Sequence, residues 1–182
     1  KFFDESLAKK IRKKHGTASI ITVNNLFANI ENLNSFIQNI DILLGENGYL
    51  IIESSYLIDM INNMVFDFIY HEHISYLSVK PLNKWLKSKD FEIKKIQPVQ
   101  TKGGSLRYYI SRTESDVNID NNVKSYLISE PSGDEIKVLF RKFSKNILTQ
   151  KEALLNEIKK YKGKVIVGYG ASATSTTLIS HF

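Results

Sequence analysis

Four adjacent residues in this chain, Tyr70-His71-Glu72-His73, carry side chains that can donate or accept protons. They follow the aromatic-rich stretch 64–69, and they contain two of the chain's 4 histidines. Titratable groups crowded together beside apolar residues are how proteins move pKa values toward neutrality. A phenol, two imidazoles and a carboxylate together could therefore supply an acid, a base and a partner that tunes them. The competing interpretation is an ordinary surface loop.

A metal site is the second chemical hypothesis for this tetrapeptide. If the segment were a strand, His71 and His73 would lie on one face, because strand side chains alternate. No third histidine is nearby in the sequence, and the chain has 0 cysteines, which removes zinc–thiolate sites and disulfides. We therefore expect no metal ligands within this chain.

The composition is that of a soluble globular protein. With 182 residues, 42% hydrophobic and 24% charged, the chain suits one domain, or one domain and part of another. No apolar run approaches the roughly 20 residues that span a bilayer, and no signal-peptide pattern opens the chain. We expect a cytoplasmic enzyme with no membrane partner.

The basic balance has a local origin. The net charge of +6 comes largely from residues 9–14, at the end of an expected helix, where cations complement the helix dipole. The charge is compatible with a small phosphorylated substrate. It does not indicate a nucleic-acid partner.

The first half of the chain reads as alternating helices and strands. Leu7 and Ile11 mark a helix between a cap at Asp4 and a stop at Gly16. Short runs of β-branched and apolar residues predict strands, and apolar residues at helical spacing predict helices. Their alternation along the chain is typical of a doubly wound α/β sheet. The predicted elements are a buried strand at 19–23, a helix at 33–44, a turn at 46–48 and a second buried strand at 49–53.

An antiparallel hairpin is predicted after the tetrapeptide. Pro81 opens a short helix, and strands follow at 91–96 and 105–112. Two strands joined by so short a link cannot be parallel. A parallel sheet finished by such a hairpin resembles the C-terminal half of the methyltransferase variant of the Rossmann fold.

The last third predicts a helical connector and the start of another α/β unit. A long amphipathic helix or helix pair covers 134–161, and a strand at 164–167 runs into a glycine turn and an apolar helix. We expect three parts: a partial methyltransferase domain (1–113), a helical connector (114–162) and the start of a second Rossmann-like domain (163–182). The chain is expected to be cut at both ends.

Four segments make the chain resemble the SAM-dependent C-methyltransferases that act on nucleotide-linked deoxysugars. These segments are 24–30, 66–76, 103–107 and 168–173. The resemblance implies S-adenosyl-L-methionine (SAM) as cofactor and a nucleotide-linked sugar as substrate. It also implies an N-terminal zinc domain and a glycine-rich SAM loop, both outside this chain, so the fragment alone is expected to be inactive.

Methylating a sugar carbon requires a base, a donor to an enolate oxygen, and alignment of carbon with methyl. The resemblance points to His73 as the base and Tyr70 as the donor. Glu72 either orients His73 or binds a sugar hydroxyl, and His71 is structural. This mechanism requires the ring of His73 to face a cleft shared by the two lobes. The runner-up is a non-catalytic relative that binds sugar nucleotide without reacting.

Asn29 departs from the family, which usually has a histidine there. It lies at the carboxyl end of the first strand, where ligands collect in open α/β sheets. An amide can hydrogen-bond to an oxyanion but cannot exchange a proton at neutral pH. Asn29 therefore either keeps a stabilising catalytic role or merely caps the following helix.

The remaining expectations concern binding. The residues after the first strand would pass beside the cofactor's sulfur, and these are Asn24, Asn25, Phe27 and Ala28. Glu53, which ends the second strand, is a weaker candidate for cofactor contact. The hairpin turn and the later glycine turn would meet the substrate, the latter by taking a diphosphate on backbone N–H groups. Those substrate residues are Lys102, Gly103, Gly104, Arg107, Gly168, Tyr169, Gly170 and Ala171. Lys102 and Thr174 depart from the family's histidine and lysine, which puts the identity of the sugar in doubt.

Overall fold

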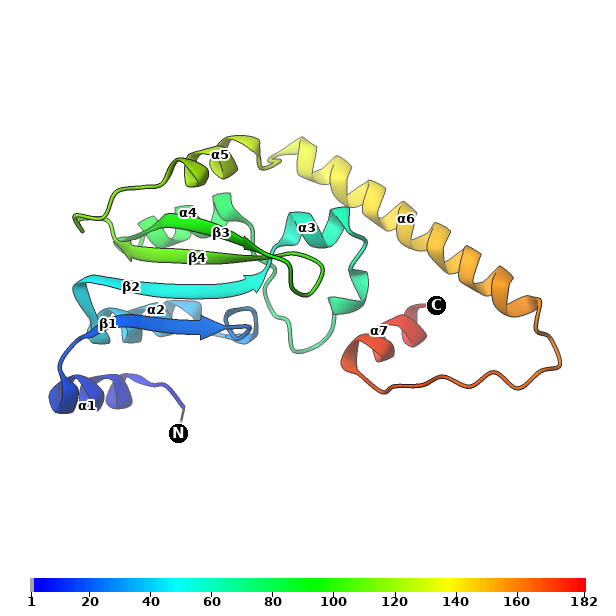
Figure 1. Ribbon diagram of the computed structural model, residues 1–182, viewed down its shortest axis with the longest axis horizontal. Coiled ribbons are helices and arrows are strands. Elements are labelled where there is room, and N and C mark those ends of the chain that lie inside the picture. Colours follow the sequence, from blue (N-terminus) through cyan, green and yellow to red (C-terminus); the bar gives the residue numbers. More distant parts are fainter. Residues whose placement is uncertain (1) are drawn as a thin grey trace.

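The computed structural model describes residues 2–182 and contains a four-stranded mixed sheet (Figure 1). The strand order is β1-β2-β4-β3. β1 pairs with β2 in parallel, whereas β4 is antiparallel to both β2 and β3. The strands are β1 (Ala18–Asn24), β2 (Leu44–Ser55), β3 (Phe91–Val99) and β4 (Ser105–Arg112). The predicted α/β class and its antiparallel hairpin are confirmed.

Helices connect and follow these strands. The α-helices are α1 (Glu5–His15), α2 (Leu33–Leu43), α3 (Leu57–Asn62), α4 (Val79–Lys87), α5 (Asn121–Ser129), α6 (Asp134–Lys159) and α7 (Ala173–His181). Two short 3-10 helices, η1 (Phe27–Asn29) and η2 (Phe66–Phe68), lie in the loops after β1 and α3. The sequence patterns did not predict α3, α5, η1 or η2.

Local signals fix the ends of the first two helices. The Asp4 carboxylate accepts a hydrogen bond from the Leu7 amide at 2.7 Å, and Gly16 ends α1 with φ 80°. The side chain of Asn32 caps α2 by accepting from the Ser35 amide at 2.9 Å. The helix predicted between Asp4 and Gly16 is therefore confirmed, and Asn32 caps the second helix.

β2 begins earlier than the pattern predicted. Ala18 of β1 pairs with Leu44 and Ile20 pairs with Tyr49, so the residues between Leu44 and Tyr49 form an irregularity in the ladder. The expected turn at 46–48 lies inside this irregularity and does not separate the helix from the strand. Gly48 is tightly packed there: an added Cβ would lie 2.8 Å from the Leu44 side chain.

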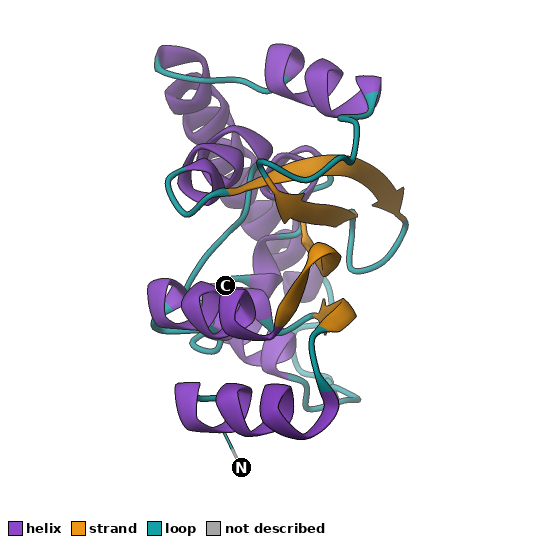
Figure 2. Ribbon diagram, turned by 90° about the vertical axis from the view of Figure 1, so that its left-hand side faces the viewer, coloured by secondary structure: helices purple, strands orange, loops and turns teal. Residues whose placement is uncertain are grey.

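The sheet buries one face more deeply than the other. Leu50, Ile52 and Tyr108 are fully buried and belong to the main core with residues of α2 and α4. Glu53 and Tyr109, on the opposite face, remain partly exposed. Helices stack along one side of the strands in Figure 2. This alternation follows from the period of two along each strand.

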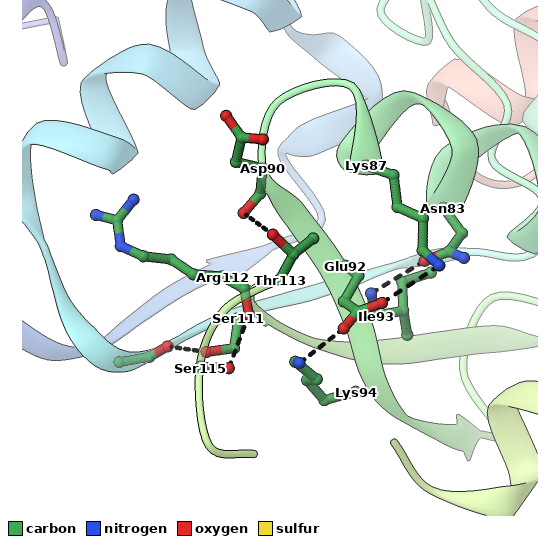
Figure 3. Close-up of polar contacts among 11 residues, drawn as sticks. Asn83, Lys87, Asp90, Glu92, Ile93, Lys94, Ser111, Arg112, Thr113 and Ser115 are labelled. Carbon is green, nitrogen blue, oxygen red and sulfur yellow. Dashed lines mark hydrogen bonds and ion pairs between the residues drawn. The ribbon is translucent and has the colours of Figure 1, made fainter. Parts of the chain in front are cut away.

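A buried ion pair stabilises the start of β3 (Figure 3). The Lys94 ammonium lies 2.7 Å from the Glu92 carboxylate, and the two residues are 3% and 8% exposed. The ladder with β4 slips between Ile93 and Lys95, and the Ile93 amide donates to Asn83 at 3.1 Å. This cluster lies where β3 begins, and the carboxyl end of β2 lies at the other end of the strands.

The C-terminal region differs from its prediction in one element. The long helix is confirmed as α6 and the final helix as α7, but residues 165–172 form no regular structure, so the strand predicted at 164–167 is wrong. Val165 and Val167 are 91% and 83% exposed. A parallel strand needs a neighbour to pair its backbone groups, and none of the described strands pairs with this segment.

α7 folds back onto the loop that precedes the tetrapeptide (Figure 1). The Phe182 ring stacks on Phe66 with centroids 5.2 Å apart, and the Thr177 hydroxyl donates to the Ile69 carbonyl at 3.2 Å.

No helix within residues 2–182 has the length and apolar character that a bilayer crossing requires.

Candidate active site

The four residues Tyr70 to His73 form a turn. The His73 amide donates to the Tyr70 carbonyl at 3.0 Å, which brings the two rings to a centroid distance of 4.3 Å. The central residues, His71 and Glu72, are exposed. The arrangement of His71 and His73 on one face of a strand, on which the metal hypothesis rested, is therefore wrong. Residues 2–182 contain no group of three or more potential ligands for a metal ion.

The turn fixes the tautomer of His73. Its Nδ1 lies 2.8 Å from the Phe68 carbonyl oxygen. Because a carbonyl can only accept, Nδ1 must carry the proton, and in the neutral ring Nε2 then keeps its lone pair. A neutral imidazole held this way can act as a base through Nε2. The orienting contact expected from Glu72 is thus made by Phe68, which leaves Glu72 only its alternative role with a sugar hydroxyl.

Two phenols surround this imidazole. Burial raises the pKa of Tyr70, and the Glu72 charge adds to the effect. Burial also raises the pKa of Tyr76, whose hydroxyl donates to the same Phe68 carbonyl at 3.4 Å. Both phenols therefore stay protonated at neutral pH and can serve as donors. Tyr76 was not predicted, although it stands only three residues after His73.

The loop that carries His73 is attached to the end of β1. The amides of Ile74 and Ser75 donate to the Ala28 carbonyl at 2.9 and 3.0 Å. The Asn25 amide donates to the Glu53 carbonyl at 2.8 Å, and Asn25 adopts φ 52°. These backbone contacts bring the His73 loop and the end of β2 beside the segment that follows β1, at the carboxyl ends of the parallel strands, where ligands collect in open sheets.

A narrow crevice opens at this junction. Of the predicted residues, it is lined by Asn25, Ala28, His73 and Lys102. Ser54 and Ser55, at the carboxyl end of β2, also line it and were not predicted. The signal that could have found them is the one used for Asn24 and Asn25, since these serines also end a strand of the sheet. The structure therefore gathers residues from four segments around the His73 ring.

Some predicted cofactor residues lie elsewhere. Phe27 is 0% exposed and packs edge-on against Phe36 and Trp85, so it is a core residue and not a cofactor contact. Asn24 is exposed and pairs in register with Glu53.

Asn29 lies in η1 and does not cap the next helix. Because Asn32 caps α2, the capping alternative for Asn29 is wrong. The side-chain oxygen of Asn29 is buried, and it has no hydrogen-bond partner among residues 2–182. A buried acceptor without a donor is costly, which is consistent with a role toward a bound group.

The glycines of the β3–β4 turn allow close packing. Gly103 and Gly104 have φ 78° and 120°. An added Cβ would lie 2.3 Å from the Val65 side chain at Gly103 and 2.4 Å from that of Asp59 at Gly104. The two glycines therefore hold the hairpin against α3 and its following loop, while Lys102 reaches the crevice.

Arg107 is engaged within the sheet. Its Nε and Nη2 donate to one Glu53 carboxylate oxygen at 3.0 and 2.7 Å, and this contact raises the pKa of Arg107. The two residues face each other in the β2–β4 ladder. The predicted substrate role of Arg107 and the weaker cofactor role of Glu53 are therefore not supported, because each side chain satisfies the other.

A second cavity lies between the tetrapeptide and α7. Tyr70 and His71 line one side, and Thr176, Ser180 and His181 line the other. Tyr70, and not His73, therefore faces the cleft between the two regions, which corrects the expectation that the ring of His73 does so.

The glycine turn before α7 is remote from these residues. Tyr169 is fully exposed, and a Cβ added at Gly168 or Gly170 would meet nothing within 4 Å. Ala171 is also exposed, and Ser172 caps α7 by accepting from the Ser175 amide at 3.3 Å. The structure does not bring the predicted diphosphate residues to the other candidates.

Comparisons with known proteins divide the chain in two. Residues 1–96 match a family model described as a methyltransferase domain, and residues 100–182 match one described as a C-methyltransferase C-terminal domain. The first match ends inside β3 and the second begins just after it, although β3 and β4 are paired along their length.

Similar proteins include a curated relative and a solved structure. C-methyltransferase NovU of Streptomyces niveus is 25% identical over 98% of this chain and 43% of its own length, so the chain spans less than half of that relative. A SAM-dependent methyltransferase from Anabaena variabilis ATCC 29413 has a TM-score of 0.43 and 17% identity, over 60% of this chain and 55% of its own.

Proposed function

Because the chain belongs to the methyltransferase-domain family, we propose that it forms part of a C-methyltransferase that uses SAM. The methyl acceptor would be the carbon beside the ketone of a nucleotide-linked keto-deoxysugar. One observation carries the proposal. The Phe68 carbonyl accepts from Nδ1 of His73 at 2.8 Å, so Nε2 keeps its lone pair, and His73 lines the crevice at the strand ends in place of the cleft that the mechanism was expected to use. The similarity to C-methyltransferase NovU supports the reaction class.

The residues that line the crevice would contact one end of the cofactor. Asn25 and Ala28 at the end of β1, with Ser54 and Ser55 at the end of β2, offer polar and small side chains where open sheets bind ligands. The buried oxygen of Asn29, without a donor among the described residues, adds an acceptor nearby in sequence. SAM bound there would supply an electrophilic methyl group on a sulfonium.

His73 and Tyr70 divide the proton chemistry. Nε2 of His73 takes the proton from the carbon beside the ketone, and the C–H electron pair moves into an enolate. The Tyr70 phenol, kept protonated by its raised pKa, donates a hydrogen bond to the enolate oxygen. The same electron pair would then form the new carbon–carbon bond to the methyl group, while the methyl–sulfur bond of the sulfonium breaks and leaves its electron pair on sulfur. The ring centroids of His73 and Tyr70 are 4.3 Å apart, so base and donor could act on neighbouring atoms of one fragment.

The cavity beside α7 would take the part of the sugar nucleotide that does not react, since His73 does not line it. Thr176 and Ser180 offer hydroxyls and His181 an imidazole, all of which can hydrogen-bond to a polyol. Lys102 is a cation at the crevice and can pair with a phosphate of the nucleotide. Its position next to the hairpin glycines gives the predicted turn a joint role in packing and in substrate binding.

The test is proton exchange at the sugar. The full-length protein that contains this chain is incubated in deuterium oxide with a keto sugar nucleotide, and deuterium beside the ketone is followed by NMR. We expect His73→Ala to reduce the exchange rate by about 100-fold or more, as for loss of a general base. His15→Gln, which changes an exposed histidine at the end of α1, is the matched control.

Two outcomes would decide against the proposal. If the protein exchanges no proton, it is not a base-generating methyltransferase, and tight sugar-nucleotide binding without exchange would instead identify the non-catalytic alternative. If His73→Ala and His15→Gln exchange equally fast, His73 is not the base.

A further inference from the structure

Glu130 is a buried carboxylate outside the site described above. It follows the last residue of α5 and is 4% exposed. One carboxylate oxygen accepts from the Tyr56 hydroxyl at 2.9 Å and from the Val79 amide at 2.6 Å, and the other accepts from the Lys80 amide at 2.7 Å. The Lys80 ammonium contacts the backbone carbonyl of Glu130. These donors satisfy a charge that would otherwise be costly to bury.

The carboxylate acts as a long-range cap for α4. Val79 and Lys80 are the first two residues of that helix, and their amides lack partners within the helix. Ser78 is of a type that often caps helices, but its side chain makes no capping hydrogen bond here. Glu130, 51 residues further along, takes that position, where a negative charge also meets the positive end of the helix dipole.

The segments that Glu130 joins are the ones that line the crevice. Tyr56 directly follows Ser54 and Ser55, and Val79 follows the loop that carries His73 and Tyr76. Backbone contacts extend the connection. The Tyr56 amide donates to the Gly104 carbonyl at 3.1 Å, and the Leu57 amide donates to the Leu77 carbonyl at 2.9 Å.

We propose that Glu130 is a positioning residue that holds the His73 loop in register with the ends of β1 and β2. It contacts no crevice residue directly and acts through Tyr56 and the start of α4. The inference rests on the proposed function for its catalytic consequence, but the loop geometry can be tested without any reaction.

The test variant is Glu130→Gln, which keeps the size of the side chain but places an amide NH2 against one of the donors. We expect backbone amides of residues 66–77 to exchange with deuterium about 10- to 100-fold faster, as for the loss of a charge-assisted hydrogen bond. We also expect substrate proton exchange to slow by about 10-fold or more, with little change in KM, since a small misplacement of the base affects the chemical step.

Glu92→Gln is the matched control. Glu92 is also buried and ion-paired, but its cluster lies at the opposite edge of the sheet (Figure 3). A purely structural role for Glu130 predicts that the two variants lose similar stability and have the same amide exchange in residues 66–77. Rescue is measured with Glu130→Asp, which restores the charge with a shorter reach and should recover part of the rate.

The outcomes separate the two proposals. Faster amide exchange in residues 66–77 for Glu130→Gln, but not for Glu92→Gln, supports the positioning role, and equal exchange in the two overturns it. If Glu130→Gln does not fold, Tyr56→Phe, which removes only one donor, decides the question by the same measurement with a smaller expected effect. If the parent protein exchanges no substrate proton, the proposed function fails, while the amide exchange still decides the role of Glu130.

Discussion

Two glycine-containing turns of this protein differ in how closely they pack against the rest of the chain. At the β3–β4 hairpin, Gly103 and Gly104 pack against α3 and its loop, with Lys102 at the crevice beside His73. At residues 168–171, the other glycine turn is exposed, and a Cβ added at Gly168 or Gly170 would meet nothing within 4 Å. A glycine turn therefore becomes part of a site only where neighbouring elements pack so closely against it that a side chain would not fit.

The largest expected loss of stability comes from adding a side chain in the packed turn. In Gly104→Ala, the new methyl group would lie 2.4 Å from the Asp59 Cβ, at φ 120°. We expect the free energy of unfolding to fall by about 2–5 kcal/mol, from strain and overpacking together. Chemical denaturation measures the loss.

Gly170→Ala is the matched variant in the other turn. Gly170 also has a positive φ, 104°, but a Cβ there meets nothing within 4 Å. We expect a change within about 0.5 kcal/mol, because an unpacked segment can change its φ without moving a neighbour. Equal losses in the two alanine variants would show that the turn before α7 is packed as tightly as the hairpin.

The second prediction compares a buried and an exposed phenol. Burial raises the pKa of Tyr108 well above its usual value near 10, and its hydroxyl has no partner among residues 2–182. Below pH about 10 the Tyr108 phenol keeps its proton in both the folded and the unfolded state, so it adds no pH dependence to the stability there. Above it the unfolded chain ionises first, and the free energy of unfolding should fall by up to about 1.4 kcal/mol per pH unit.

Phenylalanine variants test whether the Tyr108 phenol causes the loss of stability at alkaline pH. Tyr108→Phe should make the loss shallower and leave the stability at neutral pH equal or slightly higher, because it removes an unpaired buried hydroxyl. Tyr169→Phe changes a fully exposed phenol in the other region and should leave the curve as it is. An unchanged alkaline slope in Tyr108→Phe would show that the buried phenol does not contribute to it.

The smallest expected effect concerns helix caps in the two regions. Asn32 caps α2, whose Ile37 and Ile40 belong to the main core, whereas Ser172 caps α7, which has no fully buried residue. We expect Asn32→Ala to lower the free energy of unfolding by about 1 kcal/mol. Ser172→Ala should leave global unfolding nearly unchanged and speed amide exchange within α7 alone. A larger global loss from Ser172→Ala would mean that α7 folds cooperatively with the sheet.

Much of the sheet was predictable because its signals are local. β4 was predicted with its observed ends, Ser105 and Arg112, and the short link to β3 required an antiparallel pair. The strand at 164–167 was predicted from the same kind of run and did not form. Its apolar residues carry no information about whether a partner strand lies beside them.

The candidate site was predictable in its residue types but only partly in its geometry. Asn25, Ala28, His73 and Lys102 were predicted and do meet in one crevice. Arg107 and Phe27 were predicted for the same reasons, but Glu53 binds the first and the core buries the second. Whether a side chain is free depends on its partners in space, which spacing along the chain does not specify.

The sequence by itself determined the bounds of α1 and β4, through capping side chains, turn residues and apolar periodicity, each of which acts over a few residues. It also determined that proton-transferring groups are concentrated at residues 70–73. Only the tertiary structure decided which nitrogen of His73 is free, which residues share its crevice, and that Glu130 caps a helix 51 residues earlier in the chain. The physical reason is that hydrogen bonds and burial depend on distance in space, and long-range contacts leave no local pattern in the sequence.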